Sequence, residues 1–186
     1  MPQANSYTRT AVGLHWLVAV AIIGTFGLGL YMHELPFSPG KLKLYSWHKW
    51  AGVSIFLLVL VRVFWRLSHQ PPALPAHMPP WQRQAAEGAH LLLYVLMLAV
   101  PVTGWLMSSA KGVPTVWFGV LPLPDLLAKD KELGELLATL HKVLNIGMAA
   151  LVLAHVGAAL KHHFIDRDEV LVRMLPVLKK TERRTQ

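Results

Sequence analysis

Long apolar runs recur four times along the chain, separated by segments rich in charge or proline. Residues 11–32 form a run without formal charge, and further runs cover 45–67, 88–109 and 136–164. An α-helix rises about 1.5 Å per residue, so about 20 residues cross about 30 Å of hydrocarbon. The pattern predicts an all-α integral membrane four-helix bundle, with residues 1–186 forming one domain.

The segments between the runs are typical of loops. The second connection contains five prolines, which cannot continue a helix. The third, 110–135, is long enough to lie over the bundle as a lid. Within the third span, Pro101 is expected to produce a kink.

Composition supports a membrane protein and excludes several kinds of site. Hydrophobic residues make up 54% of the chain and charged residues only 15%. Cysteine is absent, which excludes disulfides, iron–sulfur clusters, thiolate zinc sites and covalently attached haem. The formal charge is +8, but the basic residues cluster between apolar runs and in the C-terminal tail, which favours a lipid bilayer over nucleic acid as the partner.

The distribution of lysine and arginine predicts the orientation. With the N-terminus in the cytoplasm, 11 of the 18 lysines and arginines fall on the cytoplasmic side, four of them in the tail (Lys179, Lys180, Arg183 and Arg184). The positive-inside rule therefore favours both termini cytoplasmic. Most tryptophans lie near span ends or in loops, as in an aromatic belt.

Four histidines lie inside the spans at two depths. His15 and His155 are near the cytoplasmic side, and His48 and His141 near the outer side. The 14 residues between His141 and His155 return to nearly the same helical face about 21 Å further along. Neutral imidazole is a good axial ligand for haem iron. Pairing by depth, His48 with His141 and His15 with His155, predicts two non-covalent b haems stacked across the bilayer.

Two arginines and three glycines extend this hypothesis. Arg62 lies 14 residues beyond His48 and, with Arg66, is placed to pair with the propionates of the inner haem. Equally, both arginines could simply anchor the span at the interface. Small residues close to the ligands leave room for a flat ring. They are Gly13, Gly52 and Gly157.

The remaining histidines leave alternatives open. His90 opens the third span at the inner side and could replace His15 as the partner of His155. His162 and His163 could exchange protons with a quinone, or simply form a solvated helix end. His33, His69 and His77 fall in loops and are expected to be solvated.

Other roles for intramembrane histidines compete with ligation. A single such residue serves equally well as an interhelical hydrogen-bond donor or in a proton path. A cofactor-free transporter or channel is disfavoured, because no span carries a central acid or lysine. The chain also shows no nucleophile, catalytic triad or phosphate-binding loop, and electron transfer between haems needs none.

Several motifs together make the chain resemble the bacterial cytochrome b561 family over essentially its whole length. The order and spacing carry the resemblance, since each fragment alone is weak. The fragments are Leu14-His15-Trp16-Leu17, Trp47-His48-Lys49-Trp50-Ala51-Gly52, Val61-Arg62-Val63-Phe64-Trp65-Arg66-Leu67, Gly88-Ala89-His90-Leu91-Leu92-Leu93-Tyr94, Pro101-Val102-Thr103-Gly104, His141, His155 and His162-His163.

The resemblance implies a multi-pass protein of the bacterial inner membrane with two b haems and ubiquinone as partner. It implies His15 with His155, and His48 with His141, as axial pairs. One branch of the family is similar to a superoxide oxidase, which passes electrons from periplasmic superoxide to ubiquinone, a superoxide:ubiquinone oxidoreductase activity. The alternative is a membrane-anchor cytochrome subunit serving a soluble hydrogenase or dehydrogenase. Outer lysines that could steer superoxide are Lys41, Lys43, Lys49, Lys111 and Lys142, partly offset by Asp125, Asp130, Glu132 and Glu135.

Overall fold

The structure is a computed structural model that describes residues 6–75, 78–175 and 177–178. Its elements follow the chain as four long helices with small additions near each end of the bundle. They are α1 (Arg9–Glu34), α2 (Pro39–Ser68), α3 (Pro80–Ala110), β1 (Val116–Trp117), β2 (Leu121–Pro122), α4 (Lys131–Lys161), the π-helix η1 (His162–Asp166) and α5 (Val170–Met174).

The four predicted spans are confirmed as helices. In the described part of the chain, four helices are long and apolar enough to cross a membrane, the fourth running continuously from Lys131 to Asp166. Each helix extends beyond the apolar run that predicted it. Side chains before three helices accept hydrogen bonds from the first turn and so set their starts. These side chains are Thr8 for α1, Ser38 for α2 and Asp130 for α4.

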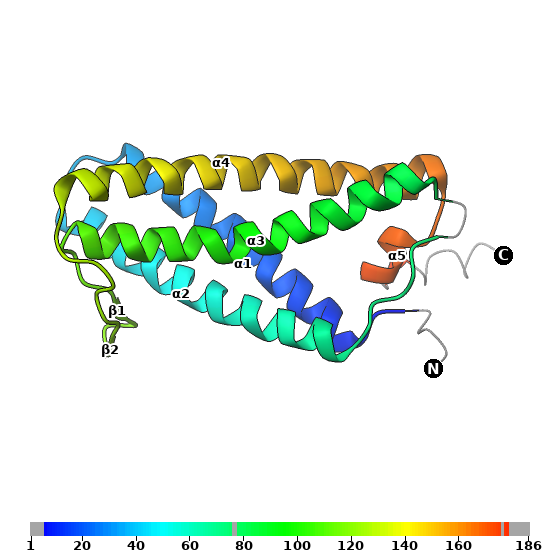
Figure 1. Ribbon diagram of the computed structural model, residues 1–186, viewed down its shortest axis with the longest axis horizontal. Helices are drawn as coiled ribbons and strands as arrows, with labels where there is room; N and C mark the ends of the chain where they lie inside the picture. The colour runs from blue at the N-terminus through cyan, green and yellow to red at the C-terminus, as the bar shows by residue number, and fades with distance from the viewer. Residues whose placement is uncertain (1–5, 76–77, 176, 179–186) are drawn as a thin grey trace.

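The helices run up and down, so the two ends of the bundle carry different connections (Figure 1). The α1–α2 and α3–α4 connections lie at one end, which we call the outer end. The first described residues, α5 and the α2–α3 connection lie at the other, which we call the inner end. Both described ends of the chain are thus on one side, as four spans require. The tail lysines and arginines counted above, and His77, lie outside the described residues.

A compact apolar core occupies the middle of the bundle. Its buried members come from all four long helices, and on α4 Met148 lies midway between His141 and His155. They are Val18, Ile55, Val59, Leu96, Met97, Val100 and Met148. This core holds the helices at fixed depth relative to one another, so histidines distant in sequence meet at each end.

Proline in the third span does not interrupt the helix. Pro101 lies inside α3, which is continuous from Pro80 to Ala110. A proline removes one backbone donor and crowds the carbonyl four residues earlier, here that of Met97. In Figure 1, α3 changes direction about midway along its length, in keeping with the expected kink.

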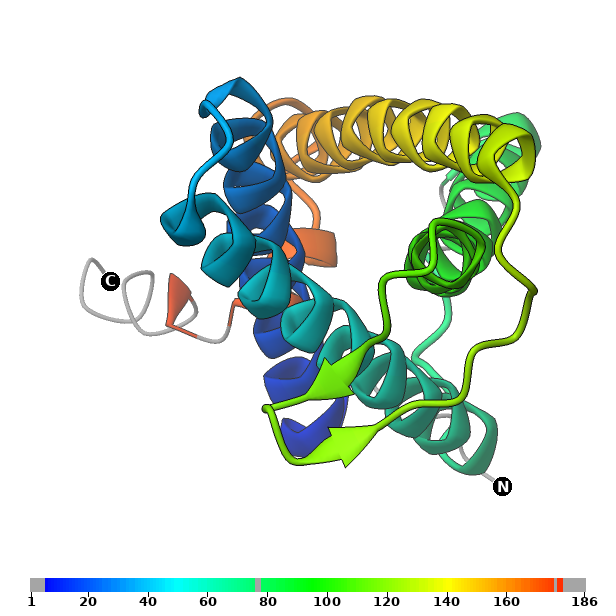
Figure 2. The same cartoon turned by 90° about the vertical axis from the view of Figure 1, so that its left-hand side faces the viewer.

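The third connection contains more regular structure than the sequence indicated. The strands β1 and β2 pair antiparallel, with Val116 opposite Pro122 and Trp117 opposite Leu121. The resulting hairpin packs against α2 and lies on the side of the bundle away from α4 (Figure 2). It is therefore attached to one flank of the bundle.

Tryptophan indoles fasten the loops to the helices. Each of three indole nitrogens donates to a loop or terminal carbonyl: Trp16 to Met174 at 2.8 Å, Trp50 to Val116 at 2.6 Å and Trp105 to Pro124 at 3.1 Å. Tryptophan suits a membrane interface because its ring is apolar and its N–H needs a partner. The expected aromatic belt thus also fixes the connections at both ends.

Candidate functional site

At the outer end, His48 of α2 faces His141 of α4. Their ring centres are 6.4 Å apart, with the ring planes nearly perpendicular. Two imidazoles on opposite sides of one metal ion have ring centres about 6 Å apart, since each metal–nitrogen bond is about 2 Å. At the observed spacing, the two rings would be able to hold one metal ion between them.

The hydrogen bonds of His141 leave one ring nitrogen free. Its Nδ1 lies 3.0 Å from the carbonyl of Val100 and 3.2 Å from Oγ1 of Thr103. The hydroxyl of Thr103 also donates to the Val100 carbonyl, at 2.9 Å. A carbonyl accepts only from a protonated Nδ1, so the lone pair of this imidazole is on Nε2. This is the usual arrangement of a metal-binding histidine, whose other nitrogen is held by a backbone oxygen.

Two glycines allow helices to approach these rings closely. A Cβ built at Gly29 would lie 3.2 Å from Cε1 of His48, and one at Gly104 would lie 3.0 Å from Cε1 of His141. Optimal contacts between carbon atoms are about 3.5–4.0 Å, so any larger residue would push the ring. Both imidazoles are thus positioned by a neighbouring helix as well as by their own.

A small cavity adjoins the outer pair. It has a volume of about 50 Å³ and is lined by apolar side chains together with the two histidines and Asn145. Gly52 lines it too, and a Cβ there would meet no atom within 4 Å. A porphyrin is much larger than this cavity, so binding one requires the surrounding side chains to move apart.

At the inner end, three histidines gather. The ring centres of His15 (α1) and His155 (α4) are 6.3 Å apart, and those of His90 (α3) and His155 are 5.5 Å apart. The first spacing resembles that of the outer pair and matches two ligands of one ion, whereas the second is somewhat short for it. All three rings are partly buried. The structure therefore brings the predicted pair together, with His90 as a close third member.

Arg62 occupies one nitrogen of His15. Its Nη2 lies 2.9 Å from Nδ1 of His15. A guanidinium can only donate, so Nδ1 accepts this hydrogen bond and Nε2 of His15 carries the proton. Arg62 and Arg66 also lie over the ring of Tyr94, at 5.5 and 5.7 Å from its centre. The two arginines are thus beside the inner histidines, as the sequence spacing predicted.

A large cavity opens next to these arginines. It encloses about 440 Å³ and is lined by residues of α1, α2 and α3, among them Tyr7, Arg62, Arg66 and Tyr94. Burial raises the pKa of the Tyr7 phenol above its usual 10.0, against the opposing effect of nearby arginine charges. A cavity with two guanidinium groups and a neutral phenol attracts an anionic group.

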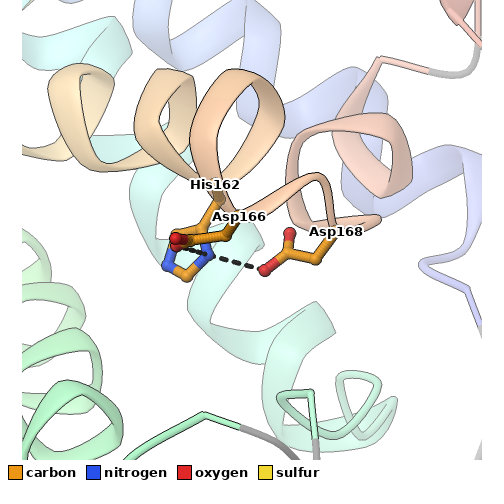
Figure 3. Close-up of side chains that lie close together, drawn as sticks. All are labelled: His162, Asp166 and Asp168. Atoms are coloured by element: carbon orange, nitrogen blue, oxygen red, sulfur yellow. Dashed lines mark hydrogen bonds and ion pairs between the residues drawn. The ribbon is translucent and has the colours of Figure 1, made fainter.

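His162 and His163 lie in the π-helix that continues α4. Nδ1 of His162 is 2.6 Å from a carboxylate oxygen of Asp168 and 3.2 Å from one of Asp166 (Figure 3). These residue types could hold a metal ion, but Lys161 already places its ammonium 2.6 Å from Asp166. The arrangement is a histidine held by two carboxylates at the inner surface. His163 packs its ring against Phe164.

Sequence reasoning missed several residues of these sites. Gly29, Gly104 and Thr103 support the outer histidines, and Asp168 supports His162. A Cβ at Gly13 or Gly157, as at Gly52, would meet nothing within 4 Å, so these positions have open space around them and do not contact an imidazole. The missed contacts of the outer histidines join residues on different helices, and only the relative rotation of the helices brings them together, whereas the contact of His162 with Asp168 is local.

Most outer lysines considered for steering superoxide hold parts of the structure together. Lys41 donates to the carbonyls of His33 and Leu35, and Lys49 to those of Val113 and Pro114. Lys111 pairs with Glu135 at 2.9 Å. Lys43 lies over the ring of Trp47. Lys43 and Lys142 are exposed.

The donor set fits a b-type haem. The outer histidines combine a metal-like spacing, a free Nε2 on His141 and open space at Gly52. His48 adds a buried Nδ1 without a regular hydrogen bond among the described residues, although the Thr25 backbone interacts with the ring. In a chain without cysteine, imidazole pairs between membrane helices suit bis-histidine haem iron. Fold and site thus define a membrane-spanning electron-transfer protein of the b-cytochrome class.

Comparison with known proteins defines the family. The model of prokaryotic cytochrome b561 matches residues 6–177, and the chain belongs to this family. Cytochrome b561 homolog 2 of Escherichia coli is 36% identical over 170 residues, covering 91% of this chain and 90% of that protein. Cytochrome b561 homolog 1 of the same organism is 29% identical, covering 92% and 98%. The protein named probable superoxide oxidase CybB of Yersinia pestis is 25% identical over 176 residues, covering 92% and 97%.

Proposed function

We propose that residues 1–186 form one domain that binds two b haems and carries electrons across the bacterial inner membrane, with both termini in the cytoplasm. One observation carries this proposal: two histidine pairs lie at opposite ends of the bundle. Their ring centres are 6.4 Å apart in the outer pair and 6.3 Å apart in the inner pair. One haem would be held by His48 and His141, the other by His15 and His155. When bound, haem supplies reversible one-electron transfer.

For the inner haem we choose His15 over His90 as the partner of His155. The His15–His155 spacing reproduces that of the outer pair, and the family resemblance implies the same choice. His90 then remains a neighbour of the site, able to donate a hydrogen bond. The choice requires Arg62 to release Nδ1 of His15, because iron binding through Nε2 leaves Nδ1 as a donor.

We assign Arg62 and Arg66 to the propionates of the inner haem. Both guanidinium groups border the 440 Å³ cavity beside His15, and carboxylates are their strongest partners. A propionate would give Arg62 the acceptor that it otherwise finds on His15. This assignment explains why two arginines stand so close to neutral histidines at this depth.

We propose superoxide as the electron donor at the outer side and ubiquinone as the acceptor in the membrane. The support is the resemblance of this chain to a protein named probable superoxide oxidase. Each superoxide gives up one electron and becomes dioxygen, so two are needed to convert one quinone and two protons into quinol. With Lys41, Lys49 and Lys111 engaged in the structure, exposed Lys43 and Lys142 are the cations left to attract the anion.

We propose that His162, with His163 beside it, supplies protons to the reduced quinone at the inner side. His162 is partly buried and held by Asp168, which in turn accepts a hydrogen bond from the backbone of Val170. A carboxylate hydrogen-bonded to an imidazole fixes the orientation of the ring. Such a pair can pass a proton from water to a site within the bundle.

Reduced-minus-oxidised spectra with haem quantitation test the two-haem assignment. The purified protein should contain two haems per chain. His141→Ala and His155→Ala should each remove or alter a different one, whereas His33→Ala, at the solvated end of α1, should leave both. Loss of the inner haem in His90→Ala but not in His15→Ala would overturn the inner pairing. A correctly inserted, colourless protein that takes up no added haem would overturn the function itself.

Reduction by superoxide distinguishes the proposed activity from the membrane-anchor alternative. Superoxide should reduce the isolated haem-loaded protein rapidly, and ubiquinone should then reoxidise it. A protein that superoxide does not reduce, and that co-purifies with a soluble hydrogenase or dehydrogenase in fixed ratio, would instead be an anchor subunit.

A further inference from the structure

An uncharged apolar hairpin projects from the flank of the bundle near the outer end (Figure 1). No charged residue occurs from Val113 to Pro124, although Lys111 and Asp125 flank this segment. Its large side chains are open to the surroundings: Phe118 is 57% exposed, Val120 83% and Leu121 51%. Clustered apolar exposure of this kind marks a surface that contacts another apolar phase.

The hairpin is fastened to the face of α2 that points away from the histidines. Trp50 donates to the Val116 carbonyl at 2.6 Å, and Trp117 donates to Oγ of Ser54 at 3.2 Å. Trp50 follows His48 by two residues, which rotates it by about 200° on a helix. Because His48 faces the bundle interior, the hairpin lies on the outward-facing side of α2.

The base of the hairpin lies level with a charged residue of α2. Lys49 donates to the carbonyls of Val113 and Pro114, at 3.0 and 3.3 Å, and so ties the base of the hairpin to the level of a charged residue. From there, Trp117 reaches one to two helical turns deeper, to Ser54. Irregular backbone cannot sit in the hydrocarbon centre, but the headgroup region can solvate it.

At the tip of the hairpin, the exposed Phe118 has a strained backbone conformation. Phe118 and Gly119 both have positive φ, 50° and 73°. Glycine adopts this region freely, whereas a bulky residue rarely does. The Phe118 ring also packs beside Trp50 and Trp117, with ring centres 5.5 and 5.1 Å away. The result is an aromatic cluster of the kind that membrane proteins concentrate at lipid interfaces.

We propose that this hairpin is a lipid-binding element that inserts Phe118, Val120 and Leu121 between lipids of the outer leaflet interface. Its occupant is lipid, because the segment is continuous with the lipid-facing surface of α2, carries no charge to match a protein partner and projects sideways from the flank of the bundle near its outer end. The proposal is independent of haem and of electron transfer. It adds a second type of membrane contact to the four spans.

The absence of cysteine from the chain allows a direct test. Val120→Cys, and separately Leu121→Cys, would be labelled with an environment-sensitive fluorophore in the haem-loaded protein in phospholipid vesicles. The matched control is Glu132→Cys, an exposed site in the first turn of α4 at the same end. An unchanged haem spectrum would verify the fold of each variant.

The hairpin labels should emit at shorter wavelength than the control. Lipids spin-labelled near the headgroup should quench them severalfold more strongly, and aqueous iodide severalfold less. Labels as accessible to iodide as the control would overturn the proposal. Labels shielded from both quenchers would overturn it as well, because a second copy or a protein partner would then cover the hairpin.

Discussion

Replacing Gly104 with alanine should selectively weaken the outer haem site. The new Cβ would lie 3.0 Å from Cε1 and 3.4 Å from Nδ1 of His141. Ordinary carbon contacts are about 3.5–4.0 Å, so ring and helix must separate by about half an ångström. The same movement strains the 3.0 Å hydrogen bond from Nδ1 to the Val100 carbonyl.

The expected loss of haem affinity follows from the role of this hydrogen bond, which orients the His141 ring. Disturbing the groups that orient a metal-binding histidine typically lowers metal affinity by about 10–100-fold, or about 1.4–2.8 kcal/mol. We therefore expect Gly104→Ala to lose haem to an excess of a haem-scavenging protein about 10–100 times more readily than the unmodified protein. The haem content should fall toward half, with the inner haem retained.

A matched control separates this effect from a general effect of alanine. Gly147 lies on α4 with His141, but a Cβ there would meet nothing within 4 Å. Gly147→Ala should keep the haem content and spectrum of the unmodified protein. Equal haem retention in both alanine variants would refute the claim that Gly104 positions His141.

Three further changes test other contacts. Arg62→Gln should lower the reduction potential of the inner haem by tens of millivolts in a redox titration, since losing a nearby cation disfavours the added electron; an unchanged potential would argue against the propionate assignment. Lys49→Met removes the hydrogen bonds to Val113 and Pro114 and should speed proteolytic cleavage of the outer loop without changing haem content. Burial raises the Tyr7 pKa above 10.0, so the contribution of the neutral phenol to folding stability is fully present below pH 10 and is lost as the pH rises further. Thermal melts of Tyr7→Phe should therefore decline less above pH 10 than those of the unmodified protein.

The fold was largely predictable because apolar runs long enough to cross a bilayer have few alternatives to helix. The depth of each histidine also follows from its place in a run, which is why His48 meets His141 and His15 meets His155. The haem number and the role of each histidine remain predictions.

Contacts that depend on helix rotation could not be predicted. Nothing in the sequence indicates that Gly29 and Gly104, rather than Gly13 or Gly157, lie against an imidazole. The hairpin escaped prediction for a different reason. Its strands have two residues each, too few for an alternating pattern, and its stability comes from indole and ammonium donors on α2.

The hydrogen bond from Arg62 to His15 has a consequence for metal selectivity during assembly. A free copper or zinc ion approaching the inner histidines would meet a fixed positive charge, and the Nδ1 lone pair of His15 would already be engaged. Haem carries its own carboxylates, which can draw the guanidinium aside and release the imidazole. The newly inserted chain would thus discourage stray cations and admit the one metal complex that brings its own counter-charge.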